Sequence, residues 1–499
     1  MITKNDLFRS LFLFSLVLFP SCADSKTAGN KETENHVCEV VSPKWASGNA
    51  NPLLDFVFSA DPTSVEHNGR LYVYATHDHQ QYETVGSDGK NSYEHINSLV
   101  MMSTDDMVNW TYHGTIPTKK ISPWIMNSWA PSIVKRVEDD GLTHFYLYYS
   151  DSGRGIGVLT STSPVGPWSD PLGHDLVDHQ TPGVGVPAPF DPGAVIDDNG
   201  VGWLSFGGGE PKTNFQPGHA RIVRLGKDMI SFDSEFVVID APYFFEASEL
   251  NYINDTWVYT YNTSWMERDV WPFDVEKPTT CCMSYMTSKT PLVRKSWKYQ
   301  HNYLKNPGEY GYDWSNNHTH LQKYRGKWYI LYHNMTLQGS FNTKGGFRNV
   351  CIDEIEVDEE KLNIHMGNQT LKGATQIQNL NPYITQQAET VAATQCVKFE
   401  QSDEAGDMLV KAAKDKGMLL VREVGFGKVP HLFQVYASGK GTIEARHHTE
   451  VGEIIATVEI DSRELKQYEV KTQKPLNGST NLCLVLRGET LSFDRWQFK

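Results

Sequence analysis

An aromatic hairpin pattern that recurs five times constrains the fold of this chain more than any other feature. Each copy places a turn of Gly, Asn or Asp before a run that alternates aromatic and aliphatic residues. Alternation of this kind is typical of β-strands that follow a tight turn. The five copies are EHNGRLYVYATHD from Glu66, DDGLTHFYLYYSD from Asp139, DDNGVGWLSFGG from Asp197, YINDTWVYTYNTS from Tyr252 and KYRGKWYILYHN from Lys323.

The spacing of these copies indicates how they are arranged. They lie about 55 to 75 residues apart, which is too long for a solenoid and suits a four-stranded propeller blade with insertions. Segments that end at Trp110, Trp168 and Trp297 supply further strand ends. The repeat therefore predicts an all-β protein that contains a five-bladed β-propeller. An irregular β-sandwich with the same hairpins is the alternative at this stage.

Composition agrees with an all-β chain and bears on the partners. Aromatic residues make up 12% of the 499 residues, and strong helix-forming runs are scarce. The formal net charge is −15 and the sequence contains no basic run, which argues against a nucleic-acid partner. Neutral sugars fit better as ligands, because they stack on flat aromatic faces.

The N-terminus predicts an exported protein. Within residues 1 to 22 an apolar run from Leu11 to Phe19, too short to span a bilayer, precedes Cys22. This arrangement resembles a bacterial lipobox, in which the cysteine is lipidated, although Pro20 departs from the usual pattern; ordinary signal cleavage is the alternative. We expect an outer-membrane or periplasmic lipoprotein that meets the membrane only through a lipid anchor at Cys22. Residues 23 to 48 then form a flexible tether.

Three carboxylates lie just upstream of repeat strands, in apolar or Pro-rich settings: Asp61 in ADP, Asp191 in FDP and Glu246 in FEAS. Taken singly, an acid of this kind is more often a turn or capping residue. In a propeller, however, the innermost strands begin around one axis, so residues far apart in sequence meet there. Three acids at corresponding places in the repeat therefore favour a shared site. Pro62 should also bias Asp61 towards extended backbone geometry.

Together these motifs resemble glycoside hydrolase family 43. The resemblance covers roughly residues 49 to 370 and implies a five-bladed propeller that cleaves glycosides with inversion. It implies Asp61 as the general base, Glu246 as the general acid and Asp191 as the residue that tunes and orients the acid. The motifs that carry it are, in chain order, ADP at Ala60, WAPS at Trp129, FDP at Phe190, FEAS at Phe245, NNHTH at Asn316 and FRNV at Phe347.

Inverting hydrolysis explains why carboxylates are needed. One ionised carboxylate activates water, and a protonated carboxyl group about 6.5 to 9.5 Å away protonates the leaving oxygen. We expect Asp191 and the apolar run from Tyr243 to Phe245 to raise the pKa of Glu246, so that it stays protonated. Glu249 is the rival acid, and strand parity places it on the face opposite to Glu246. This chemistry requires no cofactor.

The resemblance implies further site residues. His318 corresponds to a family histidine that contacts a metal ion or water on the propeller axis, and His320 on the same strand face could substitute for it. Arg348 corresponds to an arginine that donates to sugar hydroxyls, and Trp129 is a candidate wall of the sugar pocket. The alternatives are a packed core histidine, a surface arginine and a core tryptophan.

The composition changes after about Thr370. We predict the catalytic propeller at 49–375, a Gln- and Asn-rich linker at 376–394 and a β-sandwich of the jelly-roll type at 395–499. The segments VKFE and FDRWQF in this last region resemble a family 6 carbohydrate-binding module. The resemblance implies a structural Ca²⁺ held by Glu400 and Asp494.

We therefore expect an exo-acting glycosidase that releases terminal α-L-arabinofuranose from plant oligo- or polysaccharide. The FEAS motif and Trp265 resemble family members with that activity. A β-D-xylosidase is the alternative enzyme, because the two pentoses present similar hydroxyl groups. A surface glycan-binding lipoprotein without catalysis is the alternative from another class, and the complete set of three acids argues against it.

Overall fold

The computed structural model describes residues 41–499, and their regular structure is almost entirely β-strand. The described part contains two short α-helices, α1 (Asp78–Val85) and α2 (Thr118–Ile121). None of its helices is long and apolar enough to cross a membrane. The predicted signal segment with Cys22, and most of the predicted tether, lie outside the described residues.

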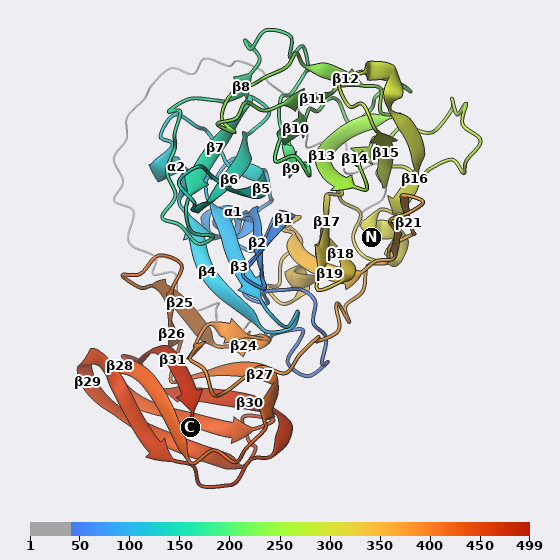
Figure 1. Cartoon of the computed structure of the whole chain (residues 1–499). Helices are drawn as coiled ribbons and strands as arrows, with labels where there is room; N and C mark the ends of the chain where they lie inside the picture. The colour runs from blue at the N-terminus through green and yellow to red at the C-terminus, as the bar shows by residue number, and fades with distance from the viewer. Residues whose placement is uncertain (1–40) are drawn as a thin grey trace, which may run out of the picture.

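Five β-sheets surround one axis and form the predicted propeller (Figure 1). Blade 1 contains β1 (Ala60–His67), β2 (Arg70–Thr76), β3 (Leu99–Thr104) and β4 (Trp110–Ile116). Blade 2 contains β5 (Trp129–Val137), β6 (Thr143–Asp151), β7 (Gly155–Ser161) and β8 (Val177–Asp178). Blade 3 contains β9 (Gly193–Ile196), β10 (Gly202–Phe206), β11 (Ala220–Arg224) and β12 (Val237–Ile239). Blade 4 contains β13 (Phe244–Ile253), β14 (Thr256–Thr263), β15 (Met283–Ser288) and β16 (Lys298–Leu304).

Blade 5 is built differently, because it has only three strands: β17 (Thr319–Tyr324), β18 (Lys327–Asn334) and β19 (Asn349–Glu354). The segment before blade 1 runs beside it, with Leu53 N donating to Val350 O at 2.9 Å and Ser59 N donating to Arg348 O at 2.9 Å. The chain thus ties its first and last blades together. Each inner strand contacts the next around the axis, in the order β1, β5, β9, β13 and β17, which confirms a closed five-bladed ring.

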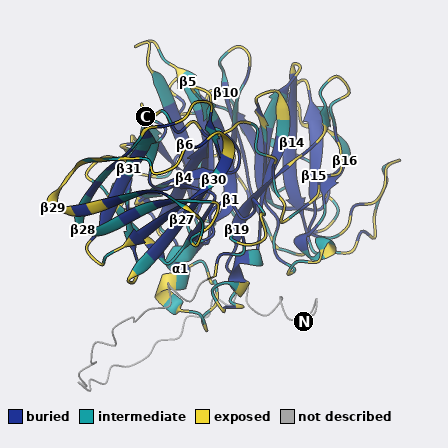
Figure 2. Ribbon diagram, turned by 90° about the horizontal axis from the view of Figure 1, so that it is seen from below, coloured by how far each residue is buried: buried dark blue, intermediate teal, exposed yellow. Residues whose placement is uncertain are grey.

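Apolar side chains fill the space between neighbouring blades. Tyr74 of blade 1 packs in one cluster with Ile133 of blade 2, and Tyr148 of blade 2 packs with Leu204 of blade 3. The repeat strands are buried on both faces as a result (Figure 2). Burial on both faces explains why the sequence runs carry so few charged residues.

The C-terminal region forms one nine-stranded antiparallel sheet that curls into a sandwich around its own core (Figure 1). Its strands are ordered β24-β27-β30-β28-β31-β26-β25, with β22 (Gln386–Gln387) on β31 and β29 on β28. The main strands are β24 (Ala393–Gln395), β25 (Val397–Gln401), β26 (Met408–Ala412), β27 (Lys416–Phe426), β28 (Leu432–His447), β29 (Ile454–Lys471), β30 (Gly478–Arg487) and β31 (Ser492–Phe498). Trp496 is 1% exposed in this core, as expected for a packing residue.

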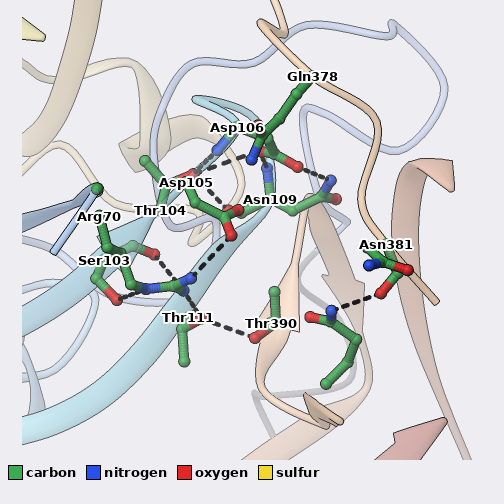
Figure 3. Close-up of polar contacts among 12 residues, drawn as sticks. Arg70, Ser103, Thr104, Asp105, Asp106, Asn109, Thr111, Gln378, Asn381 and Thr390 are labelled. Atoms are coloured by element: carbon green, nitrogen blue, oxygen red, sulfur yellow. Dashed lines mark hydrogen bonds and ion pairs between the residues drawn. The ribbon is translucent and has the colours of Figure 1, made fainter. Parts of the chain in front are cut away.

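The segment predicted as a linker is built into both domains. Within it, β22 (Gln386–Gln387) pairs with β31 of the sandwich, and β23 (Thr390–Val391) adds a fifth strand to blade 1 beside β4. Figure 3 shows the polar contacts along this seam, including the hydrogen bond between the hydroxyls of Thr111 and Thr390 at 2.7 Å. Asn109 extends the seam, because its Nδ2 donates to Arg422 O of the sandwich at 2.9 Å. The two domains are therefore joined by strand pairing as well as by side chains.

Candidate active site

The backbone at the start of each inner strand explains how the acids are aimed. In β1, Asp61 and Pro62 lie opposite the single residue Ala75, so the strand contains a bulge. Asp61 has φ 49°, which is left-handed and not the extended geometry expected before proline. The extra residue in the bulge imposes this conformation. Asp191 has φ 50° and is likewise followed by proline, at the start of the inner strand of blade 3.

The same bulge recurs in blades 2 and 4. Ala130 in WAPS (φ 40°) and Ala247 in FEAS (φ 59°) occupy the left-handed position. Asp61 and Asp191 therefore correspond to these alanines, whereas Glu246 lies one residue earlier and pairs with Asn262 of β14. The three acids are close together but do not occupy one repeat position, which refines the sequence interpretation.

Asp61 is 5% exposed and both of its carboxylate oxygens have donors. Arg348 Nη1 donates to Oδ1 at 2.9 Å, and Thr76 Oγ1 donates to Oδ2 at 2.8 Å. Burial by itself pushes the pKa of Asp61 upwards. The guanidinium charge of Arg348 and the neighbouring histidines outweigh burial and hold the pKa well below its usual range. Asp61 is therefore an ionised carboxylate at neutral pH.

Arg348 is a buried residue, so the surface alternative is wrong. It is 3% exposed, and besides Asp61 it contacts Asp78 through Nε at 2.9 Å and Nη2 at 2.8 Å. Its guanidinium also lies over the ring of Tyr93, 4.9 Å from the centroid. In the structure, Arg348 therefore donates its hydrogen bonds to Asp61 and Asp78. Its donation to sugar hydroxyls stays a prediction.

Two histidines stand beside Asp61, one predicted and one not. His318 is buried, its Nδ1 lies 3.5 Å from Asp61 Oδ1, and burial lowers its pKa to about 4. His333 Nδ1 accepts the backbone N–H of Asp61 at 3.1 Å, and its Nε2 lies 3.2 Å from Asn316 O. These two contacts fix His333 as the Nε2–H tautomer, which orients the backbone of Asp61. The contact of His318 with an axial ion or water stays a prediction.

Asp191 is placed to orient the backbone that carries Glu246. It is 5% exposed, and its Oδ2 accepts the N–H of Ala247 at 2.8 Å. The corresponding amides of blades 2 and 3, those of Ala130 and Asp191, donate to hydroxyl groups of the preceding blade, Thr76 Oγ1 and Ser150 Oγ. Gly207 occupies that repeat position in blade 3 and has no side chain to offer, so the carboxylate of Asp191 takes over.

Glu246 has a weaker set of partners than Asp61. Asn262 Nδ2 lies 3.5 Å from its Oε1, the side chain of Asn316 also contacts it, and part of the residue remains exposed. Burial of the carboxyl group, followed by the negative charge of Asp61, raises its pKa to about 8. Burial and the charge of Glu246 also raise the pKa of Asp191, which the Ala247 amide opposes. The titrations of Glu246 and Asp191 are therefore linked, and a Glu246 with a pKa of about 8 is mostly protonated at neutral pH.

Glu249 is excluded as the acid for a different reason than strand parity. Because the bulge in β13 adds a residue, Glu246 and Glu249 pair with Asn262 and Thr260, which lie two apart on β14 and share a face. The two glutamates thus point to the same side, and the parity argument is wrong. Glu249 lies deeper, 3% exposed, with an ion pair to His320 Nδ1. His320 is committed to this pair and does not substitute for His318.

Trp129 lies at the same repeat position as Glu246, because it pairs with Ser150 just as Glu246 pairs with Asn262. It is partly exposed, and its Nε1 donates to Tyr93 O at 3.2 Å. The core alternative is therefore wrong, and a position on the wall of a sugar site stays a prediction.

Sequence reasoning missed Asp78, His333 and Tyr93. Asp78 ends the first copy of the repeat but has no counterpart acid in the other copies that assigns it a role, and Tyr93 lies in the insertion between β2 and β3. His333 could have been found, because it follows the turn residue Gly326 by seven residues, as Thr76 follows Gly69 in the first copy. Aligning the first and fifth copies on their turn glycines is the signal that identifies it.

In the sandwich, the structure separates the two residues implied for Ca²⁺. Glu400 is partly exposed and forms ion pairs with Lys411 and Lys398, so its carboxylate is already paired with lysines. Asp494 is 3% exposed, and its Oδ1 has no hydrogen-bond partner. Across residues 41–499 no group of three or more His, Cys, Asp or Glu side chains is already arranged to hold a metal ion.

Comparison with known proteins agrees with this geometry. The family model described as "Glycosyl hydrolases family 43" matches residues 49–362, the region that contains all five blades. An arabinoxylan arabinofuranohydrolase of Bacillus subtilis (strain 168) is 34% identical over 523 residues, covering 98% of each chain. An arabinoxylan arabinofuranohydrolase of Paenibacillus polymyxa is 32% identical over 482 residues, covering 90% of this chain and 74% of the relative.

The similarity extends to three dimensions and to both domains. The crystal structure of a family 43 arabinoxylan arabinofuranohydrolase from Bacillus subtilis, in complex with cellotetraose, superimposes with a TM-score of 0.83 at 33% sequence identity. The match covers 91% of this chain and 98% of the other. The order of propeller and sandwich is thus shared with that protein.

Proposed function

The chain belongs to glycosyl hydrolases family 43, and we propose that its substrate is the α-L-arabinofuranosyl side group of an arabinoxylan. Membership of the family confirms the predicted enzyme class, a glycoside hydrolase, over a non-catalytic glycan-binding protein. The observation that carries the mechanism is the difference in charge state between Asp61, held ionised by Arg348, and Glu246, whose pKa is about 8.

The proposed reaction proceeds in one displacement. Asp61 accepts a proton from a water molecule as the water oxygen forms a bond to the anomeric carbon. Glu246 donates its proton to the glycosidic oxygen as the bond between that oxygen and the anomeric carbon breaks. The water attacks the face opposite the leaving group, so the configuration inverts. Asp191 holds the Ala247 amide and so orients the backbone beside Glu246, while burial and the charge of Asp61 keep the proton on Glu246.

Arabinoxylan as the polymer is supported by the relatives. Both arabinofuranohydrolases named above carry that substrate in their names, and each matches at least 90% of this chain. The identity of the released sugar, arabinose or xylose, distinguishes this activity from that of a β-D-xylosidase.

The test is a comparison of two aryl glycosides and one polymer. The enzyme should cleave 4-nitrophenyl α-L-arabinofuranoside in preference to the β-D-xyloside, and should release arabinose from wheat arabinoxylan. Proton NMR during the first turnovers should show the β-anomer of arabinofuranose as the initial product. Release of xylose as the main sugar, or retention of the α-configuration, would contradict the proposal.

We also propose that the sandwich binds Ca²⁺ through Glu389, Asp407 and Asp494. Glu389 is fully buried, and one carboxylate oxygen of each of the three acids lacks a hydrogen-bond partner. Burial and the charges of the other acids raise the pKa of Glu389, and burial together with Asp407 raises that of Asp494 to about 6. A bound cation would relieve this repulsion, with backbone carbonyls or water completing the ligands.

Thermal unfolding tests the Ca²⁺ site without reference to activity. Removing Ca²⁺ with EDTA should lower the melting temperature by roughly several degrees, and added Ca²⁺ should restore it. Asp494→Asn should abolish the response to Ca²⁺, whereas the control Glu400→Gln should keep it. An unchanged melting temperature in EDTA would refute the site.

The location of the protein is proposed from the N-terminus alone. We propose that the enzyme is an exported lipoprotein anchored at Cys22. Labelled palmitate should enter the wild-type protein in a bacterial host, and Cys22→Ala should remove the label and release the enzyme from the membrane fraction. Equal release of both forms would favour ordinary signal cleavage.

A further inference from the structure

We propose that Trp265 and Trp314 form a stacking subsite for the main chain of the polymer, beside the general acid. The proposal rests on the proposed function, because it concerns the group that leaves when the arabinofuranosyl unit is cleaved. Glu246 protonates the leaving oxygen, so the main chain that carries this oxygen must lie on the Glu246 side of the site. The residues around Glu246 therefore determine how the main chain is held.

Both tryptophans are close in sequence to residues that touch Glu246. Trp265 follows Asn262, whose Nδ2 lies 3.5 Å from Glu246 Oε1, at the end of β14. Trp314 precedes Asn316, whose side chain contacts Glu246, in the segment before β17. The two indole rings meet across the boundary of blades 4 and 5, with centroids 6.3 Å apart and planes tilted by 52°. The pair of tryptophans thus lies beside Glu246.

Trp314 is held in position by the turn beneath it. The 3₁₀ turn at Pro307–Tyr310 begins at Asn306, whose Nδ2 donates to Ser315 O at 2.8 Å. Gly308 lies directly under the indole, because a Cβ on this residue would be 2.3 Å from Trp314 Cδ2. One face of the ring therefore packs on glycine backbone. The residue as a whole stays partly exposed, as does Trp265.

Trp265 is positioned by its own loop. Its backbone N–H donates to Pro211 O at 2.9 Å, which ties the loop after β14 to the loop of blade 3. Arg268 turns inward in the same loop and covers the ring of Tyr243 at 4.5 Å from its centroid. The loop is thus anchored on both sides of Trp265, and a stacking ring on an anchored loop loses little entropy when it binds.

The charges near the pair specify the kind of sugar. Glu267, Asp269 and Asp313 are exposed next to the two tryptophans, whereas Arg268 is buried. This acidic rim disfavours uronic acid units and leaves neutral pyranose rings, which stack on indole faces through their C–H groups. The subsite is therefore suited to the unsubstituted, neutral xylose units of the main chain.

The experiment compares a polymer with a substrate that lacks the main chain. Trp314→Ala and Trp265→Ala should each lower kcat/KM on wheat arabinoxylan roughly tenfold, and should change kcat/KM on 4-nitrophenyl α-L-arabinofuranoside by less than about twofold. Trp314→Phe should recover most of the polymer activity. The matched control is Trp271→Ala, since Trp271 is in the same loop but packs on Phe273 and Tyr299.

Linear xylo-oligosaccharide supplies a second measurement in enzyme that is demonstrably folded. It should inhibit cleavage of the aryl arabinofuranoside by the wild type, and inhibition should weaken roughly tenfold in the two alanine variants. Equal losses on polymer and aryl substrate, or unchanged inhibition, would overturn the subsite. If the wild type cleaves neither substrate, the proposed function fails instead.

Discussion

Asp61 and Glu246 occupy the start of two inner strands on the same axis, yet their surroundings differ in almost every respect. Asp61 receives a guanidinium N–H and a hydroxyl, and its backbone is fixed by His333. Glu246 has two amide side chains as partners, of which Asn262 Nδ2 lies 3.5 Å from Oε1, and the negative charge of Asp61 acts on it. Neighbouring groups, and not residue type, thus set which carboxyl group is ionised.

The difference depends on where a single cation is placed. Arg348 lies against Asp61 because Asp78 holds its other edge through two hydrogen bonds. The charge on Asp61 that Arg348 stabilises then acts on Glu246 and raises its pKa. Arg348 by itself lowers the pKa of both acids, so the pKa of Glu246 is raised by burial and by the charge of Asp61, which outweigh the arginine. Four variants can test this arrangement.

Asp61→Asn should cause the largest loss. An amide keeps the shape but cannot accept the proton of the attacking water, so kcat should fall by about 10⁴-fold on every substrate. Initial rates on arabinoxylan and on 4-nitrophenyl α-L-arabinofuranoside measure the effect. An equal loss on both is expected, because water activation does not depend on the leaving group. Activity above about a tenth of wild type would show that Asp61 is not the base.

Glu246→Gln should cause a loss that depends on the leaving group. On arabinoxylan the sugar oxygen needs a proton, and kcat should fall by about 10³-fold. On the 4-nitrophenyl substrate the phenolate leaves with little help, so the loss should be at least about tenfold smaller. The ratio of the two losses is the measurement. A ratio near one, as expected for Asp61→Asn, would remove the distinction between the two acids.

The repeat made the fold and the approximate site predictable from sequence. Five aromatic runs predicted five blades, and the acids upstream of them, Asp61, Asp191 and Glu246, do gather at one end of the axis. Such predictions succeed because a strand that is buried on both faces must be apolar throughout, and the pattern is visible in the chain.

The features that could not be predicted from the sequence depend on backbone geometry and on contacts between distant segments. The bulge in β13 reverses the parity argument for Glu249, and a bulge of this kind leaves no composition signal when its left-handed residue is alanine. Asp78 ends the first copy of the repeat, but only the folded ring brings it to Arg348, 270 residues later. The predicted linker likewise contains β22 and β23, which are too short for periodicity to reveal.

Asp78→Asn should lower kcat by loosening the contact between Arg348 and Asp61. The amide oxygen can accept one N–H from Arg348 in place of two, so the guanidinium and Asp61 should lose their fixed orientation. A fall in kcat of roughly 10²-fold on the aryl substrate is expected, with KM changed far less. Asp105→Asn is the matched control, because Asp105 pairs with Arg70 on the seam with the sandwich (Figure 3). A similar loss in both variants would indicate a general effect on folding.

Asp191→Asn should shift the alkaline limb of the pH profile, which depends on the protonation of Glu246. Glu246 acts when protonated, so wild-type kcat/KM should fall as the pH rises through about 8. Removing the negative charge of Asp191 lowers the pKa of Glu246, and the alkaline fall should therefore begin at lower pH. The acid limb, set by Asp61 with its lowered pKa, should stay where it is.

Profiles of kcat/KM on the aryl arabinofuranoside provide the measurement, with Glu249→Gln as a control that removes a buried acid of the same strand. An alkaline limb that stays in place, or moves upwards, would mean that Asp191 acts on Glu246 only through the Ala247 amide.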